Sequence, residues 1–402
     1  MANRIIQTIG IVRRIAIKTI YYNRNRDYST WIFGEWFGNR CDDNSLYLAN
    51  YVASRAELGI NVFWVAKEDC DTSLLDARIK IIRYDSREAR HYFRTAGVVV
   101  MNQGMEDFSE KGYNYFDGAI ILNLWHGVPW KKIGLDGGHR EDDLDRWFLK
   151  TLIKMQGYSY FLSTSKVINK HICSAFDISE KNILNEGYPR NSVLYDTEKR
   201  DEVRKALISE LRLDKSYRII AYLPTFRDSE KTSFSFFSFC ENNKSFVELL
   251  KEEKILIIEK NHFVDMKRHL NSEEYLDNIV VNGKKYHTQE LLLSCDLLIT
   301  DYSSCFFDYL LTDRPIIHFL YDYEYYRNDD RGLYYKPEDV VGGVIVYDSN
   351  DLLDAILTEF NDPSRNKELR KLRREEFLAS ESDTSLKNIT EFLLNECNKR
   401  NR

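Results

Sequence analysis

Several features that would assign a protein to a class are absent from this sequence. Its seven cysteines are scattered and include no CxxC pair, which argues against a disulfide framework and a cysteine-based zinc site. No run of about 18 apolar residues occurs, so no membrane-spanning helix is expected. Basic residues interrupt the apolar N-terminus, and no small-residue cleavage site follows, so no signal peptide is expected. We therefore predict a cytoplasmic protein.

Strong charge and low complexity are absent as well. The chain has 57 Lys and Arg against 63 Asp and Glu, a net charge of −6, which argues against a general nucleic-acid binder. Its 402 residues are 43% hydrophobic and include only six prolines, so a large core can form and extended linkers have little room. At roughly 150 residues per domain, the length predicts two or three domains.

The N-terminal segment is basic and amphipathic. Apolar residues recur there near helical spacing, and the first 26 residues contain no acidic residue but six basic ones: Arg4, Arg13, Arg14, Lys18, Arg24 and Arg26. Such a helix can lie in an anionic membrane interface. The alternative is a helix packed on the protein's own surface.

The rest of the chain alternates short apolar runs with longer amphipathic ones. The runs predict strands at Ile60–Ala66, Ile79–Tyr84, Gly97–Met101, Ala119–Leu124, Tyr158–Leu162, Arg218–Leu223, Ile255–Lys260, Ile279–Val281, Leu297–Thr300, Pro315–Phe319 and Val344–Tyr347. Helices are predicted between them, at Ser45–Leu58, Arg140–Gln156, Lys199–Leu211, Phe246–Glu253 and Ser304–Thr312. This alternation is typical of doubly wound α/β domains with parallel sheets.

The series is interrupted by a turn-rich stretch near residues 187–201, where we place a domain boundary. The predicted organisation is an amphipathic segment 1–30, a Rossmann-like domain 31–195, a second Rossmann-like domain 196–375 and a C-terminal helix 376–402. We expect the two α/β domains to face each other across a cleft.

His126 is the first candidate for chemistry. It follows the predicted strand Ala119–Leu124, and ligands of open α/β sheets bind at the carboxyl ends of strands. An imidazole suits removal of a proton from a hydroxyl. Gly127 permits close backbone approach, and Lys131 and Lys132 can meet an anion. The alternative is a core histidine at a strand end.

The second half offers a matching pair, Lys260 and His262, at the end of the strand Ile255–Lys260. His262 could donate a hydrogen bond or positive charge to a phosphate oxygen, and Lys260 could add charge. The alternative is an ordinary polar loop.

A buried strand also leads into Thr300 and Asp301, then into a helix capped by Ser303 or Ser304. Free N–H groups at a helix start bind anions, and hydroxyls there can contact phosphate oxygens. The alternative is an ordinary capped helix. The segment is not a P-loop, because it has no GK[ST] sequence.

Two further loops carry arginines suited to phosphate binding. Thr225 and Arg227 follow the strand Arg218–Leu223, and Arg331 lies in an aromatic loop that starts near residue 321. Both loops could equally be surface turns. Asp301, Asp308 and Asp322 could form a divalent-metal site, but their spacing fits no known cage. We therefore predict no metal-binding residues and no firm cofactor, and the sequence leaves a requirement for a divalent ion open.

Together and in order, these segments resemble the CDP-glycerol glycerophosphotransferase family, which includes teichoic-acid primases and polymerases and capsule polymer synthases. The matching segments are residues 124–134 (LWHGVPWKKIG), 187–191 (GYPRN), 223–228 (LPTFRD), 260–262 (KNH), 300–304 (TDYSS), 321–322 (YD) and 331–332 (RG). The resemblance extends from Trp31 to the mid-300s. Two positions depart from it, since Phe263 replaces a frequent proline and Trp130 a frequent leucine.

The resemblance implies a GT-B-like fold and transfer of a polyol phosphate from a CDP-activated donor to a hydroxyl of a lipid-linked or polymer acceptor, with release of CMP. It favours glycerol phosphate, with ribitol phosphate as the alternative. It makes His126 the base for the acceptor and domain 31–195 the acceptor side, to which Gly127, Lys131 and Lys132 are assigned. It makes domain 196–375 the CDP-donor domain and places His262, Ser303, Ser304 and Arg331 at the donor phosphates. It also implies a peripheral location at the cytoplasmic membrane face.

Two other functions remain open from the sequence. The two facing α/β halves would also suit a GT-B glycosyltransferase that uses a nucleotide sugar. The basic N-terminus and charged C-terminal helix would suit a non-catalytic scaffold docked on the membrane. The sequence predicts no oligomeric state and does not separate a primase from a polymerase.

Overall fold

The structure is a computed structural model that describes residue 12 and residues 25–110, 116–137, 143–225, 234–261, 275–276, 279–324 and 332–401. The chain divides into two compact units. Unit 1 comprises the residues up to His126, Ile133–Ser192 and the residues from Ala379. Unit 2 comprises Gly127–Lys132 and Val193–Leu378.

Unit 1 is built on a seven-stranded parallel sheet with the order β3-β2-β1-β4-β5-β6-β7. Most of its strands are apolar and buried because helices cover a parallel sheet on both faces. The strands are β1 (Asp27–Phe33), β2 (Asn61–Ala66), β3 (Lys80–Arg83), β4 (Ala96–Met101), β5 (Ile120–Asn123), β6 (Tyr160–Ser163) and β7 (Ile183–Asn185).

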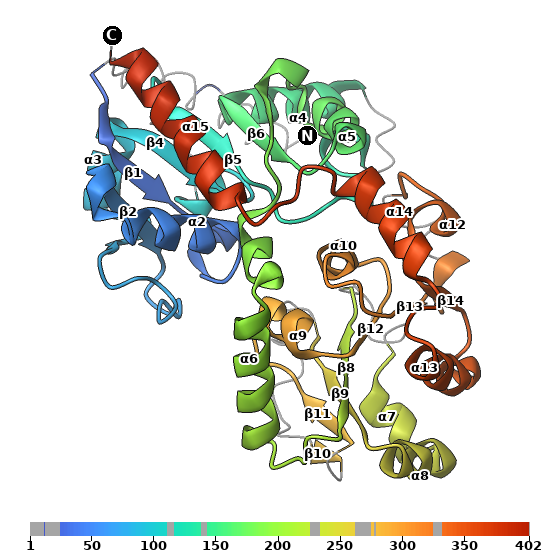
Figure 1. Ribbon diagram of the computed structural model, residues 1–402. Coiled ribbons are helices and arrows are strands. Elements are labelled where there is room, and N and C mark those ends of the chain that lie inside the picture. Colours follow the sequence, from blue (N-terminus) through green and yellow to red (C-terminus); the bar gives the residue numbers. More distant parts are fainter. Residues whose placement is uncertain are drawn as a thin grey trace. The chain divides into compact units, whose positions relative to one another are not determined.

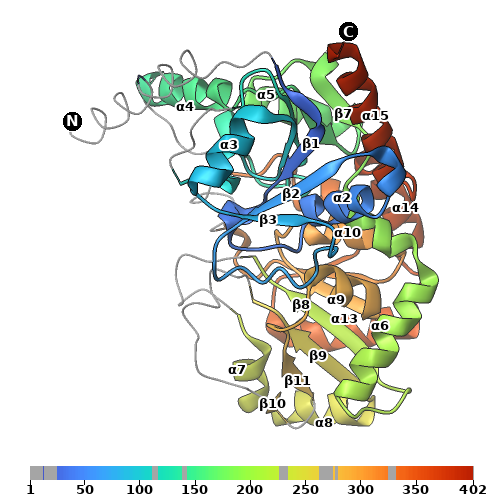
Figure 2. The ribbon, with the colours of Figure 1, turned by 90° about the vertical axis from the view of Figure 1, so that its left-hand side faces the viewer.

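The helices of unit 1 come from both ends of its sequence. They are α2 (Asn44–Ala53), α3 (Arg87–Thr95), α4 (Asp143–Met155), α5 (Lys166–Phe176) and the late helix α15 (Ser385–Arg400). Helix α15 contacts β4, β5 and α2, and Figure 1 shows it crossing this sheet. Helices α2 and α3 contact β1, as can be followed in Figure 2.

Unit 2 contains a second seven-stranded sheet with the order β10-β11-β9-β8-β12-β13-β14. Every strand pair in it is parallel except β10 with β11. The strands are β8 (Arg218–Leu223), β9 (Ile255–Glu259), β10 (Tyr275–Leu276), β11 (Val280–Asn282), β12 (Leu297–Thr300), β13 (Ile316–Phe319) and β14 (Val344–Val346).

Helices of unit 2 contact the strands β8, β9, β12, β13 and β14 of this second sheet. The helices of the unit are α6 (Thr197–Glu210), α7 (Phe236–Glu241), α8 (Lys244–Glu252), α9 (Thr288–Ser294), α10 (Cys305–Leu310), α12 (Pro337–Val340), α13 (Leu352–Asn361) and α14 (Lys367–Phe377). Helix α6 packs on α9, and α10 packs on α14 (Figure 1).

The predicted architecture of two α/β domains with parallel sheets is confirmed. The predicted helix Ser45–Leu58 ends earlier, at Ala53, and a 3₁₀ turn at Ala56–Leu58 follows it. Of the N-terminal amphipathic segment 1–30, residues 1–24 lie outside the described residues apart from Val12. In the part of the chain that the structure describes, no helix is long and apolar enough to cross a membrane.

Strand β1 was missed by the sequence prediction, although it lies between β2 and β4 in the sheet. Its first residues are polar, and its register with β4 shifts between Asp27 and Trp31. Gly97 of β4 lies at this shift, where a Cβ would come within 2.4 Å of the Tyr28 Cα. A side chain at Gly97 would therefore force the two strands apart.

We expect Gly97→Ala to lower the free energy of unfolding by about 2–3 kcal/mol, because the added methyl group meets backbone that cannot move aside. Gly59→Ala is the matched control: a Cβ there meets nothing within 4 Å, and only the left-handed backbone (φ +65°) opposes it, at about 1 kcal/mol. Urea unfolding followed by tryptophan fluorescence would compare them. Equal losses would contradict the steric account.

Candidate functional site

His126 lies just beyond the carboxyl end of β5, where the chain leaves the sheet of unit 1. The Leu124 N–H still donates to the Met101 carbonyl oxygen of β4, at 2.8 Å. The next residue, Trp125, adopts a left-handed conformation with φ +56°, and its N–H donates to the Asn123 side-chain oxygen at 2.7 Å. This turn brings the half-buried His126 to the sheet edge at which open α/β sheets bind ligands.

Two distant side chains hold this turn through its carbonyl groups. The Asn44 amide, at the start of α2, donates to the Trp125 carbonyl oxygen at 2.9 Å. The Arg190 guanidinium donates to the His126 carbonyl oxygen at 3.0 Å. Arg190 belongs to the GYPRN segment, which the sequence analysis used only for the domain boundary and the resemblance. Nothing in its local pattern reveals this contact, because 64 positions separate it from His126.

The residues that follow His126 belong to unit 2. Trp130 is almost fully buried there, with its ring 5.4 Å from Tyr302 and 5.8 Å from Phe306 between centroids. Its indole N–H donates to the Tyr335 carbonyl oxygen at 3.0 Å. The tryptophan that departs from the family pattern is therefore an anchor in the core of unit 2.

Lys131 and Lys132 follow that anchor and are half-buried. The Lys132 N–H donates to the Gly332 carbonyl oxygen at 3.0 Å, and Lys131 forms a β-bridge with Leu333. Both lysines and Gly127 are predicted from the family resemblance to lie on the acceptor side. The structure places all three in unit 2, the unit that contains the predicted donor residues.

In unit 2, Asp301 joins the carboxyl ends of β8 and β12. Its fully buried carboxylate accepts the Thr225 N–H at 2.8 and 3.0 Å and the Thr225 hydroxyl at 2.6 Å. The Thr300 hydroxyl donates to the Leu223 carbonyl oxygen at 2.6 Å. Thr225, Thr300 and Asp301 thus lie together at this edge of the sheet, and these contacts bind them to the protein itself.

Ser303 and Ser304 come next and are half-buried. The Ser303 hydroxyl accepts the Cys305 N–H at 3.4 Å, whereas Ser304, at the N-cap position of α10, makes no side-chain capping bond. The helix begins at Cys305, one residue later than predicted. The Ser304 hydroxyl is consequently not used to cap the helix it precedes.

Glu259, at the end of β9, is a residue that the sequence analysis missed. Its buried carboxylate accepts the Phe236 N–H at 2.8 Å and the Ser235 hydroxyl at 3.2 Å, which ties the start of α7 to the end of β9. Burial raises the pKa of this carboxyl to about 7. A glutamate that ends an otherwise apolar strand was the signal available in the sequence. Its neighbour Lys260 is half-buried, and its N–H donates to the Tyr222 carbonyl oxygen at 3.0 Å.

Three predicted site residues, Arg227, His262 and Arg331, lie outside the described residues. Among the residues that are described, no group of three His, Cys, Asp or Glu side chains is placed to hold a metal ion.

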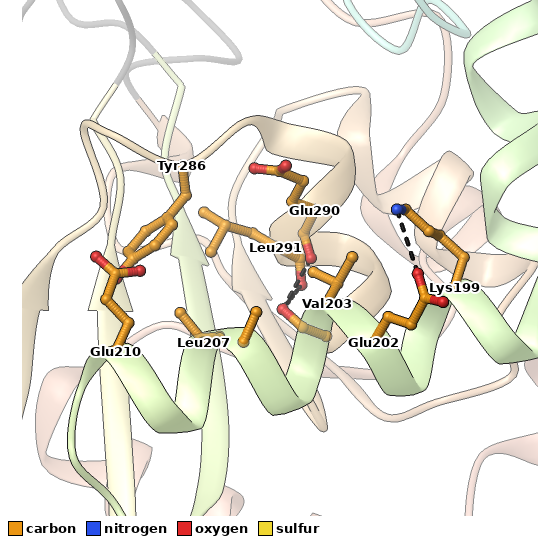
Figure 3. A pocket seen from close by; sticks show the side chains of 10 residues that line it. Lys199, Glu202, Val203, Leu207, Glu210, Tyr286, Glu290 and Leu291 are labelled. Atoms are coloured by element: carbon orange, nitrogen blue, oxygen red, sulfur yellow. Dashed lines mark hydrogen bonds and ion pairs between the residues drawn. The ribbon is translucent and has the colours of Figure 1, made fainter.

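A separate pocket lies between α6 and α9 in unit 2, with a volume of about 440 Å³ (Figure 3). Val203, Leu207 and Leu291 provide its apolar lining. Lys199 and Glu202 form an ion pair at 3.4 Å on one side. Of the predicted site residues that the structure describes, none lines this pocket.

The chain is similar to known proteins over most of its length. A family model described as CDP-glycerol:poly(glycerophosphate) glycerophosphotransferase matches residues 17–395. A teichoic acid poly(glycerol phosphate) polymerase of Bacillus spizizenii is 28% identical over 335 residues, covering 81% of this chain and 82% of that protein. A teichoic acid glycerol-phosphate transferase of Staphylococcus aureus is 27% identical over 344 residues, covering 83% and 84%.

The solved structures give the same fold. A wall teichoic acid polymerase, TagF, superposes with a TM-score of 0.80 at 20% identity, covering 100% of this chain and 99% of the other. The predicted GT-B-like fold class is therefore confirmed.

The buried Glu259 predicts a specific dependence of stability on pH. Because the folded state retains this proton to higher pH than the unfolded state, its contribution to stability is lost as pH rises from about 4.5 to about 7. Glu259→Gln removes that loss. Between pH 5 and 7.5 we expect the free energy of unfolding of the variant to gain about 2 kcal/mol on that of the wild type. Denaturant titrations at both pH values measure it.

Glu248→Gln on the exposed face of α8 is the control for this comparison. It changes the same chemical group without burial, so it should follow the wild type at both pH values. If the curves of Glu259→Gln and the wild type stay parallel, the raised pKa of Glu259 is wrong.

Proposed function

The chain belongs to the CDP-glycerol:poly(glycerophosphate) glycerophosphotransferase family, and we propose that it transfers glycerol phosphate from CDP-glycerol to a hydroxyl of a lipid-linked or polymer acceptor. The product is a teichoic-acid or capsule-type polymer, and CMP is released. The observation that carries this proposal is His126, presented at the carboxyl end of β5 by the turn at Trp125.

In the proposed reaction, the acceptor hydroxyl gives its proton to the His126 imidazole. The acceptor oxygen forms a bond to the phosphorus that carries the glycerol, and the bond from that phosphorus to the bridging oxygen breaks. The electron pair of that bond leaves with CMP. Transfer of this kind depends mainly on positioning and on stabilising the charge that grows on the leaving group.

Unit 2 is assigned to the CDP donor. The Ser303 and Ser304 hydroxyls follow β12 at its carboxyl end, and Lys260 follows β9, which is separated from β12 by β8. On the family resemblance alone, we propose that the phosphates also receive hydrogen bonds from Arg227, His262 and Arg331. Asp301, Thr225 and Thr300 support this edge, because their hydrogen bonds hold the ends of β8 and β12 together.

The proposed location is the cytoplasmic face of the membrane, where a lipid-linked acceptor would be found. The basic, amphipathic residues 1–30 would contact the anionic surface. Burial of apolar side chains and attraction of Lys and Arg to anionic lipids would act together in such a contact.

The first test is the release of CMP from CDP-glycerol and from CDP-ribitol, with and without a lipid-linked acceptor. We expect acceptor-dependent CMP from CDP-glycerol, reduced at least ~1,000-fold in His126→Ala because the base is lost. His171→Ala, at a half-buried histidine on α5 in the same unit, should retain activity.

The other outcomes separate the alternatives. CMP from CDP-ribitol alone would keep the reaction and change the polyol. Activity only with nucleotide sugars would identify a glycosyltransferase, and the absence of any donor-dependent thermal shift would favour a scaffold. A fully active His126→Ala would reject the proposed base.

Ser303→Ala and Ser304→Ala test the assignment of the donor to unit 2. Each should raise the KM for the CDP donor ~10-fold, because a hydrogen bond from a neutral hydroxyl to a phosphate oxygen contributes little more than ~1 kcal/mol to binding. The KM for the acceptor should stay within twofold. Initial rates at varied donor and acceptor concentrations measure both, and an effect confined to the acceptor KM would contradict the assignment.

A further inference from the structure

We infer that Asp43, Arg190 and Trp36 position the His126 imidazole, and that Asp43 is the centre of this group. The inference rests on the proposed function in one respect, since it takes His126 to be the base. All four residues belong to unit 1.

The Asp43 carboxylate joins three separate parts of unit 1. One oxygen accepts the Asn44 N–H at 2.7 Å, as the N-cap of α2, and also accepts Arg190 Nη1 at 2.8 Å. The other oxygen accepts the Trp36 indole N–H at 2.9 Å. The Asp43 and Arg190 side chains are only 6% and 10% exposed, so water competes little for these bonds.

Arg190 carries this anchorage to the backbone of His126. Its Nη1 contacts both the Asp43 carboxylate and the His126 carbonyl oxygen. Its own N–H donates to the Asn44 side-chain oxygen at 3.1 Å, and the same Asn44 amide donates to the Trp125 carbonyl oxygen. The Trp125 carbonyl oxygen is therefore held by Asn44, the residue that follows Asp43. The next carbonyl oxygen, that of His126, is held by Arg190, which is bonded to Asp43.

Trp36 acts on the imidazole ring itself. Its ring centroid lies 5.4 Å from that of His126, and the Trp125 ring lies 4.1 Å from His126. The bond from the Trp36 indole N–H to Asp43 fixes the orientation of the indole. Trp36 and Trp125 both have left-handed backbones, with φ of +47° and +56°, a conformation that non-glycine residues keep only when their surroundings impose it.

The turn that presents Asp43 is itself anchored in the core. The fully buried Glu35 accepts the N–H groups of Asp42 and Asp43, the latter at 2.8 Å. The Trp36 N–H donates to the Gln103 side-chain oxygen at 2.8 Å, which ties the same turn to the end of β4. The position of Asp43 is thus fixed by buried side chains. Through its contacts with Arg190 and Trp36, Asp43 in turn fixes the position of His126.

The main variant is Arg190→Lys, which keeps the charge but lacks the planar fork of a guanidinium. Arg26→Lys is its matched control: Arg26 is also buried in unit 1 and donates to backbone carbonyls, those of Phe93, Ala96 and Asp117. We expect Arg190→Lys to lower kcat ~10–100-fold with the donor KM within twofold. Arg26→Lys should lower the melting temperature and leave kcat within threefold.

Two readouts separate positioning from general loss of structure. The imidazole ¹H–¹³C resonance of His126, assigned with His126→Ala, senses the nearby indole rings and should move in Arg190→Lys and in Trp36→Leu but not in Arg26→Lys. Trp36→Phe keeps an aromatic ring and loses the bond to Asp43, so its kcat should lie between those of the wild type and Trp36→Leu. If Arg190→Lys does not fold, Trp36→Phe provides the test of the inference in its place.

The inference is overturned if the His126 resonance and kcat are unchanged in the Arg190 and Trp36 variants. It is also overturned if Arg26→Lys lowers kcat as much as Arg190→Lys does. If His126→Ala stays active while Arg190→Lys still moves the resonance, the proposed base is wrong and the positioning network stands.

Discussion

The features assigned to unit 1 depend on one backbone conformation that a tryptophan would not adopt by itself. Between β5 and His126 the chain turns through a left-handed Trp125. Such a conformation is unfavourable by about 1–2 kcal/mol for a residue with a Cβ. The Asn123, Asn44 and Arg190 side chains compensate with hydrogen bonds to the N–H and carbonyl groups of the turn. The sheet fixes strand β5, and side chains distant in sequence fix the turn after β5 that presents His126.

In both units, buried acidic side chains hold the loops at the edge of the sheet in place. In unit 1, Asp43 connects loops at the carboxyl edge of the sheet. In unit 2, Asp301 secures the end of β8 and Glu259 secures the start of α7. A carboxylate with two or more donors can remain buried at acceptable cost. These acids therefore organise the loops, while His126 and Ser304 remain half-buried.

The regular part of the fold was predictable because apolar strands have a local signature. The fully buried AGVVVM of β4 and the ILIIE of β9 are recognisable without any partner. Strand β1 was not, since half of DYSTWIF is polar and its place in the sheet depends on pairing with β2 and β4. The order of motifs likewise led to His126 as the proposed base. The roles of Arg190 and Trp130 follow from contacts with residues 64 and 205 positions away, which no local pattern contains.

The division of the chain has a consequence for how the protein is made. Unit 1 takes its last helix, α15, from residues that follow the whole of unit 2 in the sequence. During synthesis on the ribosome, β4 and β5 therefore emerge about 270 residues before the helix that covers them, so at roughly 5–20 residues per second their apolar surface waits for many seconds. The segment Gly127–Lys132 of unit 2 is synthesised early, so unit 2 can fold before the helix α15 of unit 1 is available. The sheet of unit 2 is therefore synthesised in full before the helix α15 that covers the sheet of unit 1.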